Sequence, residues 1–298
     1  SDNIVNASEA SAGVTVSGST TAEAGQIVTV TLNNPAAQTY QATVLADGTW
    51  SITIPATDLA GLADGRYPLI ATVNDKAGNP ASTTHNLVVD LTVPVLTINT
   101  IAGDDILNAV EHGQALVISG SSTGGEAGDV VTVTLNNKAY TTTLDASGNW
   151  SVGVPAADVT ALGSGPQTVT ATVTDAAGNS DDDSRTVTVN LTAPTIGINT
   201  LATDDVINAT EKGADLHISG TSNQPAGTTV TVTLNGQNYT ATTDAAGNWS
   251  TTVPASAVGA LGEASYTVTA NVTDSAGNSH STSHTVQVNT ALPGVTIN

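Results

Sequence analysis

The chain has 298 residues, of which 26 are acidic and 5 are basic, so its formal net charge is −21. Nucleic acid and anionic membranes are poor partners for such a chain, because phosphate binding requires Lys and Arg side chains. We therefore expect cations as partners. The sequence contains no cysteine, which excludes disulfides, thiolate metal sites and a cysteine nucleophile. No apolar stretch approaches the roughly 18 residues that span a bilayer, so we expect no membrane insertion by this segment.

Three signatures recur along the chain. Trp50, Trp150 and Trp249 each follow a Gly-containing turn and precede a Ser, at intervals of 100 and 99 residues by subtraction of their numbers. In step with them run Asp-x-Ala-Gly-Asn loops at 75–79, 175–179 and 274–278, and Pro-ending linkers at 90–94, 190–194 and 289–293. A repeat of this length can enclose a core of its own, whereas solenoid units of roughly 20 to 50 residues cannot. The spacing predicts three domains.

We place the domains at residues 1–92, 93–192 and 193–292. The first begins inside an acidic loop, and we expect it to lack its first strand. Residues 293–298 resemble the start of a further repeat, which predicts that the sequence is an excerpt of a longer protein.

Each repeat consists of short alternating runs rich in Val, Thr and Ile, bounded by Gly, Asn, Asp and Pro, which is typical of antiparallel strands joined by turns. In the third repeat these runs predict seven strands, at residues 195–199, 216–220, 229–234, 238–243, 249–253, 266–273 and 281–289. Asn235-Gly236 predicts a hairpin turn with positive φ at both positions. The fold class is therefore all-β, with three tandem immunoglobulin-like β-sandwich domains of about seven strands each, arranged as an extended rod on the order of 100 Å long.

The aromatic residues have a structural interpretation. The three Trp residues are expected in the cores, because the chain has no Phe or Met to fill them. Tyr67 and Tyr266 stand where sandwich domains often have a Tyr whose hydroxyl ties a corner together. The second repeat has Gln167 there, so we expect it to lack this device.

Acidic loops are expected to meet where one domain follows another. With the strands alternating in direction, the loop after the first strand lies at one end of the sandwich. The loop before the Trp strand and the Asp-x-Ala-Gly-Asn loop lie at the other end. The first of these loops is itself repeated, as residues 2–9, 104–111 and 204–211. In a tandem array, the end of one domain that carries the first kind of loop faces the end of the next domain that carries the other two. We therefore expect carboxylates to converge at each junction.

Converging carboxylates in a chain with 5 basic residues require a cation, and Ca²⁺ takes six to eight hard oxygen ligands. The candidates at the first junction are Asp2, Glu9, Asp90, Asp145 and Asp175. Those at the second junction are Asp104, Asp105, Glu111, Asn190, Asp244 and Asp274. Asn6 and Asn108 could add oxygens. The alternative is turn chemistry, because Asp caps its own backbone and Gly or Asn accepts positive φ. Asp181-Asp182-Asp183 is interpreted as a solvated stretch of hairpin.

These motifs together resemble the bacterial immunoglobulin-like (BIg) repeats of giant adhesins exported by type I secretion. The resemblance covers all 298 residues. It implies calcium at the domain junctions, a secreted or bacterial cell-surface location, and attachment to host epithelial cells. It extends the calcium role to the equivalent acidic positions of the other copies, Asp47, Asp75, Asp204, Asp205 and Glu211. Asn3, Asn190 and Asn289 replace acidic residues of the family pattern, so we expect weaker or absent ion binding at those sites.

The favoured function is therefore a non-enzymatic, calcium-rigidified spacer in the stalk of a surface adhesin. Its partners are the adjacent repeats of the same chain and, through the full-length adhesin, a host-cell glycan or protein; the segment itself is expected to be a monomer. The alternative is a ligand-binding module for a glycan or protein receptor near the adhesin tip. An enzyme is disfavoured. The segment Gly120-Ser121-Ser122-Thr123-Gly124 matches the nucleophile-elbow pattern of hydrolases, but that motif requires a turn from a strand into a helix, and here a loop follows the strand. His280 and His284 are at best a weak pair of transition-metal ligands.

Overall fold

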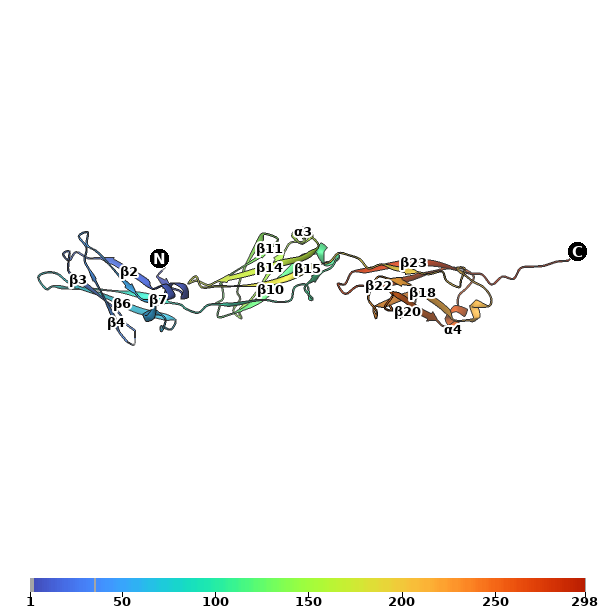
Figure 1. The fold of residues 1–298 in the computed structure, drawn as a ribbon, viewed down its shortest axis with the longest axis horizontal. Coiled ribbons are helices and arrows are strands. Elements are labelled where there is room, and N and C mark those ends of the chain that lie inside the picture. The colour runs from blue at the N-terminus through green and yellow to red at the C-terminus, as the bar shows by residue number, and fades with distance from the viewer. Residues whose placement is uncertain (1–2, 35, 298) are drawn as a thin grey trace. The chain divides into compact units, whose positions relative to one another are not determined.

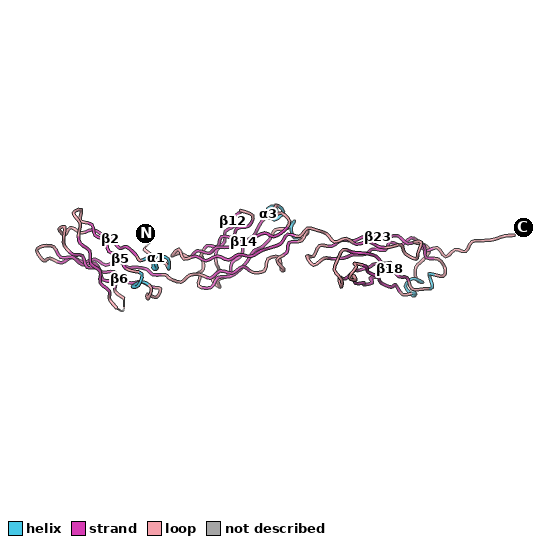
Figure 2. Tube along the Cα trace, in the orientation of Figure 1, coloured by secondary structure: helices cyan, strands magenta, loops and turns pink. Residues whose placement is uncertain are grey.

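The computed structural model describes residues 3–34 and 36–297. Strands dominate every repeat and the helices are short, as Figures 1 and 2 show. The predicted all-β class is therefore confirmed. Contacts divide the chain into two compact units, residues 1–101 with 117–154 and 168–186, and residues 102–116 with 155–167 and 187–298. The boundary between the units passes through the second repeat.

The first repeat is a sandwich of a two-stranded and a five-stranded sheet. Its elements are β1 (Ile4–Val5), α1 (Ala7–Ala12), β2 (Val14–Ser19), β3 (Ile27–Leu32), β4 (Gln38–Thr43), β5 (Thr49–Ile54), α2 (Ala56–Leu59), β6 (Gly65–Asn74) and β7 (Pro80–Val89). The small sheet pairs β2 with β5, and the large sheet has the order β1-β7-β6-β3-β4. The alternating apolar residues of both sheets face each other and form the core, which includes Leu32, Trp50 and Ile54.

The second repeat adds one strand to the small sheet. Its elements are β8 (Val95–Ile98), β9 (Ile106–Leu107), η1 (Glu111–Gly113), β10 (Leu116–Thr123), β11 (Val130–Leu135), β12 (Lys138–Thr143), β13 (Asn149–Val154), α3 (Ala156–Thr160), β14 (Gly165–Thr174) and β15 (Ser180–Val189). The sheet orders are β13-β10-β8 and β12-β11-β14-β15-β9.

The third repeat has the same sheet orders as the second, β16-β18-β21 and β17-β23-β22-β19-β20. Its elements are β16 (Ile196–Ile198), β17 (Val206–Ile207), η2 (Glu211–Gly213), β18 (Leu216–Ser222), β19 (Thr229–Leu234), β20 (Gln237–Thr242), β21 (Asn248–Val253), α4 (Ala255–Gly259), β22 (Ser265–Thr273) and β23 (Ser279–Val288). All seven predicted strands are present. The strand that the pattern missed is β17, whose two residues pair in parallel with β23 and are too few to show an alternation.

The predicted core role of the three Trp residues is confirmed, since Trp50, Trp150 and Trp249 are 8 %, 3 % and 2 % exposed. Each indole packs on a glycine of the adjacent strand in the same sheet. A Cβ added to Gly220 would lie 2.4 Å from Cζ2 of Trp249, so any larger residue there would displace the indole. Asn235 and Gly236 have φ of 49° and 75°, as the hairpin prediction requires.

Two expectations about the second repeat are wrong. Gln167 does replace the corner tyrosine, because its Nε2 donates to the carbonyl of Gly163 at 2.9 Å, as the Tyr67 hydroxyl donates to the Ala63 carbonyl at 2.9 Å. Asp181 and Asp183 are not simply solvated. Their carboxylates accept the backbone N–H groups of two β8 residues, each at 2.8 Å, and so occupy donors that an edge strand would leave open.

No helix in the described part of the chain has the length and apolar character that a membrane crossing requires.

Candidate functional site at the repeat junctions

The Asp-x-Ala-Gly-Asn loop of the second repeat is bonded to the first repeat through the amide of Asn179. Asp175 shapes the loop, because its Oδ1 accepts the Asn179 N–H at 2.8 Å and its Oδ2 accepts Asn179 Nδ2 at 2.9 Å. Asn179 Oδ1 then accepts the N–H of Ala7 at 2.8 Å, and its Nδ2 donates to the carbonyl of Asp90 at 3.0 Å. The side chain of Asn179 thus links the first acidic loop, the linker and the second repeat. We call this arrangement the asparagine clamp.

The second junction has an asparagine clamp with the same connections. Asp274 Oδ1 accepts the N–H of Asn278 at 2.8 Å. Asn278 Oδ1 accepts the N–H of Ala109 at 2.8 Å, and its Nδ2 donates to the carbonyl of Asn190 at 2.9 Å. Asn179 and Asn278 are both 4 % exposed. The predicted meeting of the acidic loop with the Asp-x-Ala-Gly-Asn loop is present at both junctions, and the neutral amide of an asparagine joins the two loops.

The Glu of each acidic loop caps its own helical turn. Glu9 Oε2 accepts the N–H of Asn6 at 3.2 Å, and Glu9 N–H donates to Asn6 Oδ1 at 2.9 Å, which is a capping box. Glu111 and Glu211 make the corresponding bonds to the N–H groups of Asn108 and Asn208, at 3.1 and 3.0 Å. The structure therefore gives these three carboxylates a local role.

The Asp residues before the Trp strands also lie in their own turns. Oδ1 of Asp47, Asp145 and Asp244 accepts backbone N–H groups two residues further on, at 3.0, 2.8 and 2.8 Å. The pKa of all three carboxyl groups is held below the usual range. For Asp47 the largest cause is the hydroxyl of Thr49, and for Asp145 and Asp244 it is the backbone N–H of Asn149 and of Asn248. Turn chemistry accounts for these positions.

The paired Asp residues of the acidic loops also make bonds within their own repeats. Asp104 and Asp204 each accept the N–H two residues further on at 3.0 Å. Asp105 and Asp205 have a φ of 63°, and the Asp105 carbonyl accepts the N–H of Thr188 at 2.8 Å. Asp205 Oδ1 is 2.7 Å from Nε2 of His284, so this histidine contacts a carboxylate of its own repeat. Asp2 lies outside the described residues.

The structure does bring Asp90 and Asp175 together, in a cavity of about 290 Å³ at the first junction. Three further carboxylates line this cavity, those of Asp64, Glu126 and Asp129, and no basic side chain is among the lining residues. We call these five residues the carboxylate cluster. Asp64 is bonded to the linker, since it accepts the N–H of Leu91 at 2.6 Å.

Burial and like charge act on Asp90. Its pKa is raised above the ordinary value, first by desolvation and then by the charge of Asp175, with smaller contributions from Asp64 and Glu126. The hydrogen bond that Asp90 accepts from the N–H of Thr92 is long, at 3.3 Å, and offsets only part of this effect. A cation in the cavity would remove the repulsion that these carboxylates exert on one another.

The carboxylate cluster fits calcium in its chemistry, because all of its charged side chains offer hard oxygen donors. Within the described chain, however, no three His, Asp or Glu side chains are close enough together to hold a metal ion as they stand. Ion binding therefore requires the side chains around the cavity to turn inward.

Sequence reasoning missed Asp64, Glu126 and Asp129. A signal was present for one of them, since Glu-Ala-Gly recurs as residues 23–25 and 126–128. The other two could be found only from the proximity of loops that are distant in sequence.

The loop of the first copy keeps the internal geometry of the clamp. Asn79 N–H and Nδ2 donate to Asp75, each at 2.8 Å. Asn79 is exposed, whereas Asn179 and Asn278 are buried. This loop has the conformation of a clamp, and its amide is exposed to solvent.

Comparison with known proteins gives the family. A family model described as a bacterial Ig-like domain matches residues 1–91, 94–191 and 197–290. No curated protein matches the chain.

Solved structures of adhesins are similar to the chain. One is of a 1.5-MDa bacterial ice-binding adhesin, in work on host cell surface retention; it has 32 % identity, a TM-score of 0.50, and coverage of 97 % of this chain and 95 % of that one. Another is of a Ca²⁺-stabilized adhesin with which an Antarctic bacterium binds ice, with 38 % identity, a TM-score of 0.49, and coverage of 98 % and 72 %.

Proposed function

The chain belongs to the family of bacterial immunoglobulin-like domains, and we propose that it is an extender segment of a giant bacterial surface adhesin whose first junction is stabilised by calcium. The adhesin assignment is supported by the 32 % identity to a bacterial ice-binding adhesin over 97 % of this chain. The chain is non-catalytic, as expected for this family.

The observation that carries the calcium part of the proposal is the carboxylate cluster beside an asparagine clamp. Asp90 lies on the linker, and Asp175 belongs to the loop that positions Asn179. An ion held by Asp90, Asp175 and Glu126 would bind both the linker and the second repeat. Because separating the repeats would break up this ligand set, ion binding would favour the closed junction by mass action.

Calcium itself supplies positive charge among carboxylates that otherwise repel. Asp64 and Asp129 accept backbone N–H groups, from Leu91 at 2.6 Å and from Glu126 at 2.7 Å. These two residues can hold the linker and the Glu126 loop in place while the other carboxylates approach the ion. The cluster would then stabilise the closed junction to a degree that increases with calcium concentration.

The finer features of the proposal come from the sequence motifs. Their resemblance to the Salmonella adhesin SiiE extends the proposal to type I secretion, a bacterial cell-surface location and attachment to host cells. The domain limits 1–92, 93–192 and 193–292 are a further part of it. Calcium binding by the remaining acidic loop residues is left out of the proposal, because most of these carboxylates accept backbone N–H groups of their own loops.

Two solution measurements test this function. Calorimetric titration of the chelated chain with Ca²⁺ is expected to show saturable binding that is lost in a Asp90→Asn, Asp175→Asn double variant. Small-angle scattering is expected to show a change in maximum dimension when EDTA is added. An absence of binding, or an unchanged scattering profile on chelation, would overturn the calcium-stabilised spacer. Binding of the chain to a glycan array would instead support a receptor-binding module.

A further inference from the structure

The last strand of the second repeat holds the first strand of that repeat through side chains. Asp181 Oδ2 accepts the N–H of Leu96 at 2.8 Å, and Asp183 Oδ2 accepts the N–H of Ile98 at 2.8 Å. Arg185 completes the set, since its Nη1 donates to the carbonyl of Ile98 at 3.2 Å. These three side chains of β15 therefore bond both kinds of backbone group of β8, which belongs to the other sheet. We call Asp181, Asp183 and Arg185 the interstrand latch.

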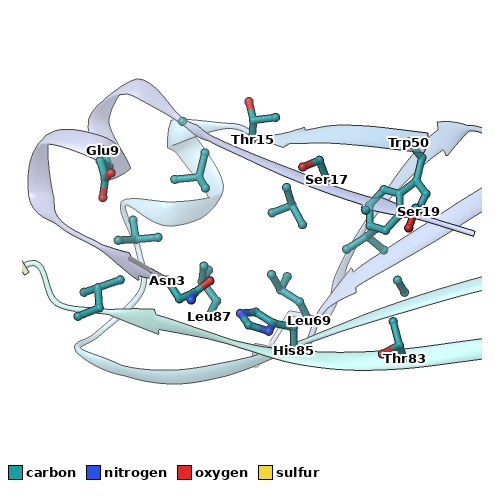
Figure 3. Close-up of a pocket in the computed structure, with 18 of the residues that line it drawn as sticks. Asn3, Glu9, Thr15, Ser17, Ser19, Trp50, Leu69, Thr83, His85 and Leu87 are labelled. Carbon is teal, nitrogen blue, oxygen red and sulfur yellow. The ribbon is translucent and has the colours of Figure 1, made fainter. Parts of the chain in front are cut away.

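The alternation of β15 explains why the latch residues act together. Odd-numbered residues of this strand share one face, and Val187 and Val189 on the same face are buried in the core. The latch side chains are therefore directed from the large sheet toward the small one. Figure 3 shows the same face of β7 in the first repeat, where Thr83 and His85 occupy equivalent positions and line a pocket beside β2.

The third repeat has the same two strands without the latch. The positions equivalent to the latch residues hold His280, Thr282 and His284. The ring of His284 contacts Asp205 at 2.7 Å instead of the first strand. Among the residues that the structure describes, no hydrogen bond joins β16 to β23. The two repeats thus share their sheet orders and differ in how the first strand is held.

A second contact of the last strand is common to both repeats. β9 pairs in parallel with β15, and β17 pairs in parallel with β23. In the second repeat, Thr188 N–H donates to the carbonyl of Asp105 at 2.8 Å. In the third repeat, Gln287 N–H donates to the carbonyl of Asp205 at 2.9 Å. This pairing therefore does not distinguish the two repeats, and the latch does.

The latch joins two strands that run in the same direction, because successive contacts advance by two residues on both strands. They join Leu96 to Asp181, Ile98 to Asp183 and Thr100 to Arg185. Tension along the chain enters the second repeat at the start of β8 and leaves it at the end of β15. It therefore pulls these two strands past each other along a common axis, and the latch bonds resist this sliding together.

We infer that the second repeat resists mechanical unfolding more strongly than the third, and that Asp181, Asp183 and Arg185 are the residues responsible. Release of β8 from β15 breaks hydrogen bonds of charged side chains, which are roughly twice as strong as neutral ones. β16 is released from β23 without such a loss. The inference rests on the proposed function only for the source of the tension, since an adhesin segment bears the force between a cell and the surface that it holds.

The latch gives the chain a defined order of unfolding, because forced unfolding is governed by the unfolding rate of each repeat. Under tension the third repeat is expected to unfold before the second. Its extension lengthens the chain and lowers the tension on the other repeats. The second repeat then stays folded and keeps Asp175 and Asn179 in place at the first junction.

Single-molecule pulling of the intact chain from its two ends tests the inference. The slowest unfolding step is expected to belong to the second repeat. The double variant Asp181→Ala, Asp183→Ala is expected to accelerate this step about tenfold at constant force, equivalent to about 1.4 kcal/mol. The matched control is Asp182→Ala, because Asp182 lies on the opposite, exposed face of β15. The control should change the rate by less than about twofold.

A second pulling geometry separates a mechanical role from a general loss of stability. The natural chain has no cysteine, so cysteine handles can be placed at Asn137 and Ala146. Force then enters through β12, which lies at the edge of the large sheet opposite to β9. The wild type and the double variant are expected to release β12 at the same rate, because the latch is still intact when this strand detaches.

Three outcomes would overturn the inference. The first is an unchanged end-to-end unfolding rate in the double variant, and the second is an equal acceleration by Asp182→Ala. The third is an equal acceleration in both pulling geometries, because these side chains would then only stabilise the fold. The measurements are made in calcium and again in EDTA. The latch predicts the same difference between variants in both buffers, so its failure is distinguished from a failure of calcium binding.

Discussion

The two repeat junctions share one joint but differ in charge. Asn179 and Asn278 make matching bonds to the preceding loop and to the linker, with lengths that agree within 0.1 Å. Around Asn179 the carboxylate cluster contains five acidic residues. At the equivalent positions of the second junction one acid remains; in chain order these positions hold Ser164, Asn190, Pro225, Thr228 and Asp274.

The difference separates two tasks, joining the repeats and binding an ion, that the sequence pattern alone does not distinguish. The Asp-x-Ala-Gly-Asn loop builds a joint of hydrogen bonds between an asparagine amide and backbone groups. In the proposed function, calcium dependence would be set by variable positions outside this motif, such as position 90, where the first linker has Asp and the second has Asn190. A chain of similar repeats can therefore contain junctions that respond to calcium and junctions that do not.

Among the substitutions, removal of either clamp asparagine should have the largest effect on the free energy of junction opening. The effect should be the same at both junctions. Asn179→Ala and Asn278→Ala each leave a buried N–H and a carbonyl without their partner, which costs about 2 kcal/mol of junction opening free energy. Hydrogen exchange of the loop amides measures this cost. Asn79→Ala is the control, and because Asn79 is exposed its effect should be below about 0.5 kcal/mol. A small effect at either buried site would contradict the shared clamp.

Substitution of the linker residue should weaken the calcium response of the first junction without creating one at the second. Asp90→Asn is expected to weaken calcium binding about tenfold, or about 1.4 kcal/mol, by removal of a charged ligand. Asn190→Asp, the reciprocal change, should leave the second junction insensitive, because the other four positions there supply one carboxylate. Calorimetric titration of both variants checks this. Equal calcium affinity in wild type and Asp90→Asn would contradict the role of the linker carboxylate.

Acidification should stabilise only the first junction in chelated protein. The raised pKa of Asp90 means that the folded junction binds a proton more tightly than the open one. Stability is therefore lost as the pH rises through that raised pKa, and is recovered as the pH falls toward the ordinary value. Below that value, the lowered pKa of Asp64, which results first from the Thr92 hydroxyl and then from the Leu91 N–H, acts in the opposite direction. A hydrogen-exchange series from pH 7 to about pH 4.5, corrected for intrinsic rates, should show this rise at the first junction alone.

Salt should have the smallest effect. In chelated protein, an increase in NaCl from about 0.01 to 0.15 M screens the carboxylate cluster and should stabilise the first junction by a few tenths of a kcal/mol. The second junction, with one carboxylate among the equivalent positions, should change less. A larger salt response at the second junction would contradict the claim that the repulsion between carboxylates is concentrated at the first junction.

The sequence was sufficient for the fold because strand alternation and turn residues are local signals. The seven strands of the third repeat and the buried Trp residues were predictable for this reason. Strand β17 was not, since its two residues gain their meaning only from pairing with β23.

The site was less predictable, because one residue pattern serves two purposes. An Asp before a Gly-Asn turn is equally suited to capping and to calcium binding, and the structure gives Asp47, Asp145 and Asp244 capping bonds. The approach of Glu126 to Asp90 depends on how two distant loops fold, which no local pattern encodes.

The most direct test is hydrogen exchange of the intact chain with and without calcium, followed at both asparagine clamps. At a calcium concentration about 100 times the dissociation constant, the loop at 175–179 should gain about 2.7 kcal/mol of protection. The loop at 274–278 should be unchanged. Equal gains at both loops, or no gain at the first, would contradict a calcium-dependent first junction beside a calcium-independent second one.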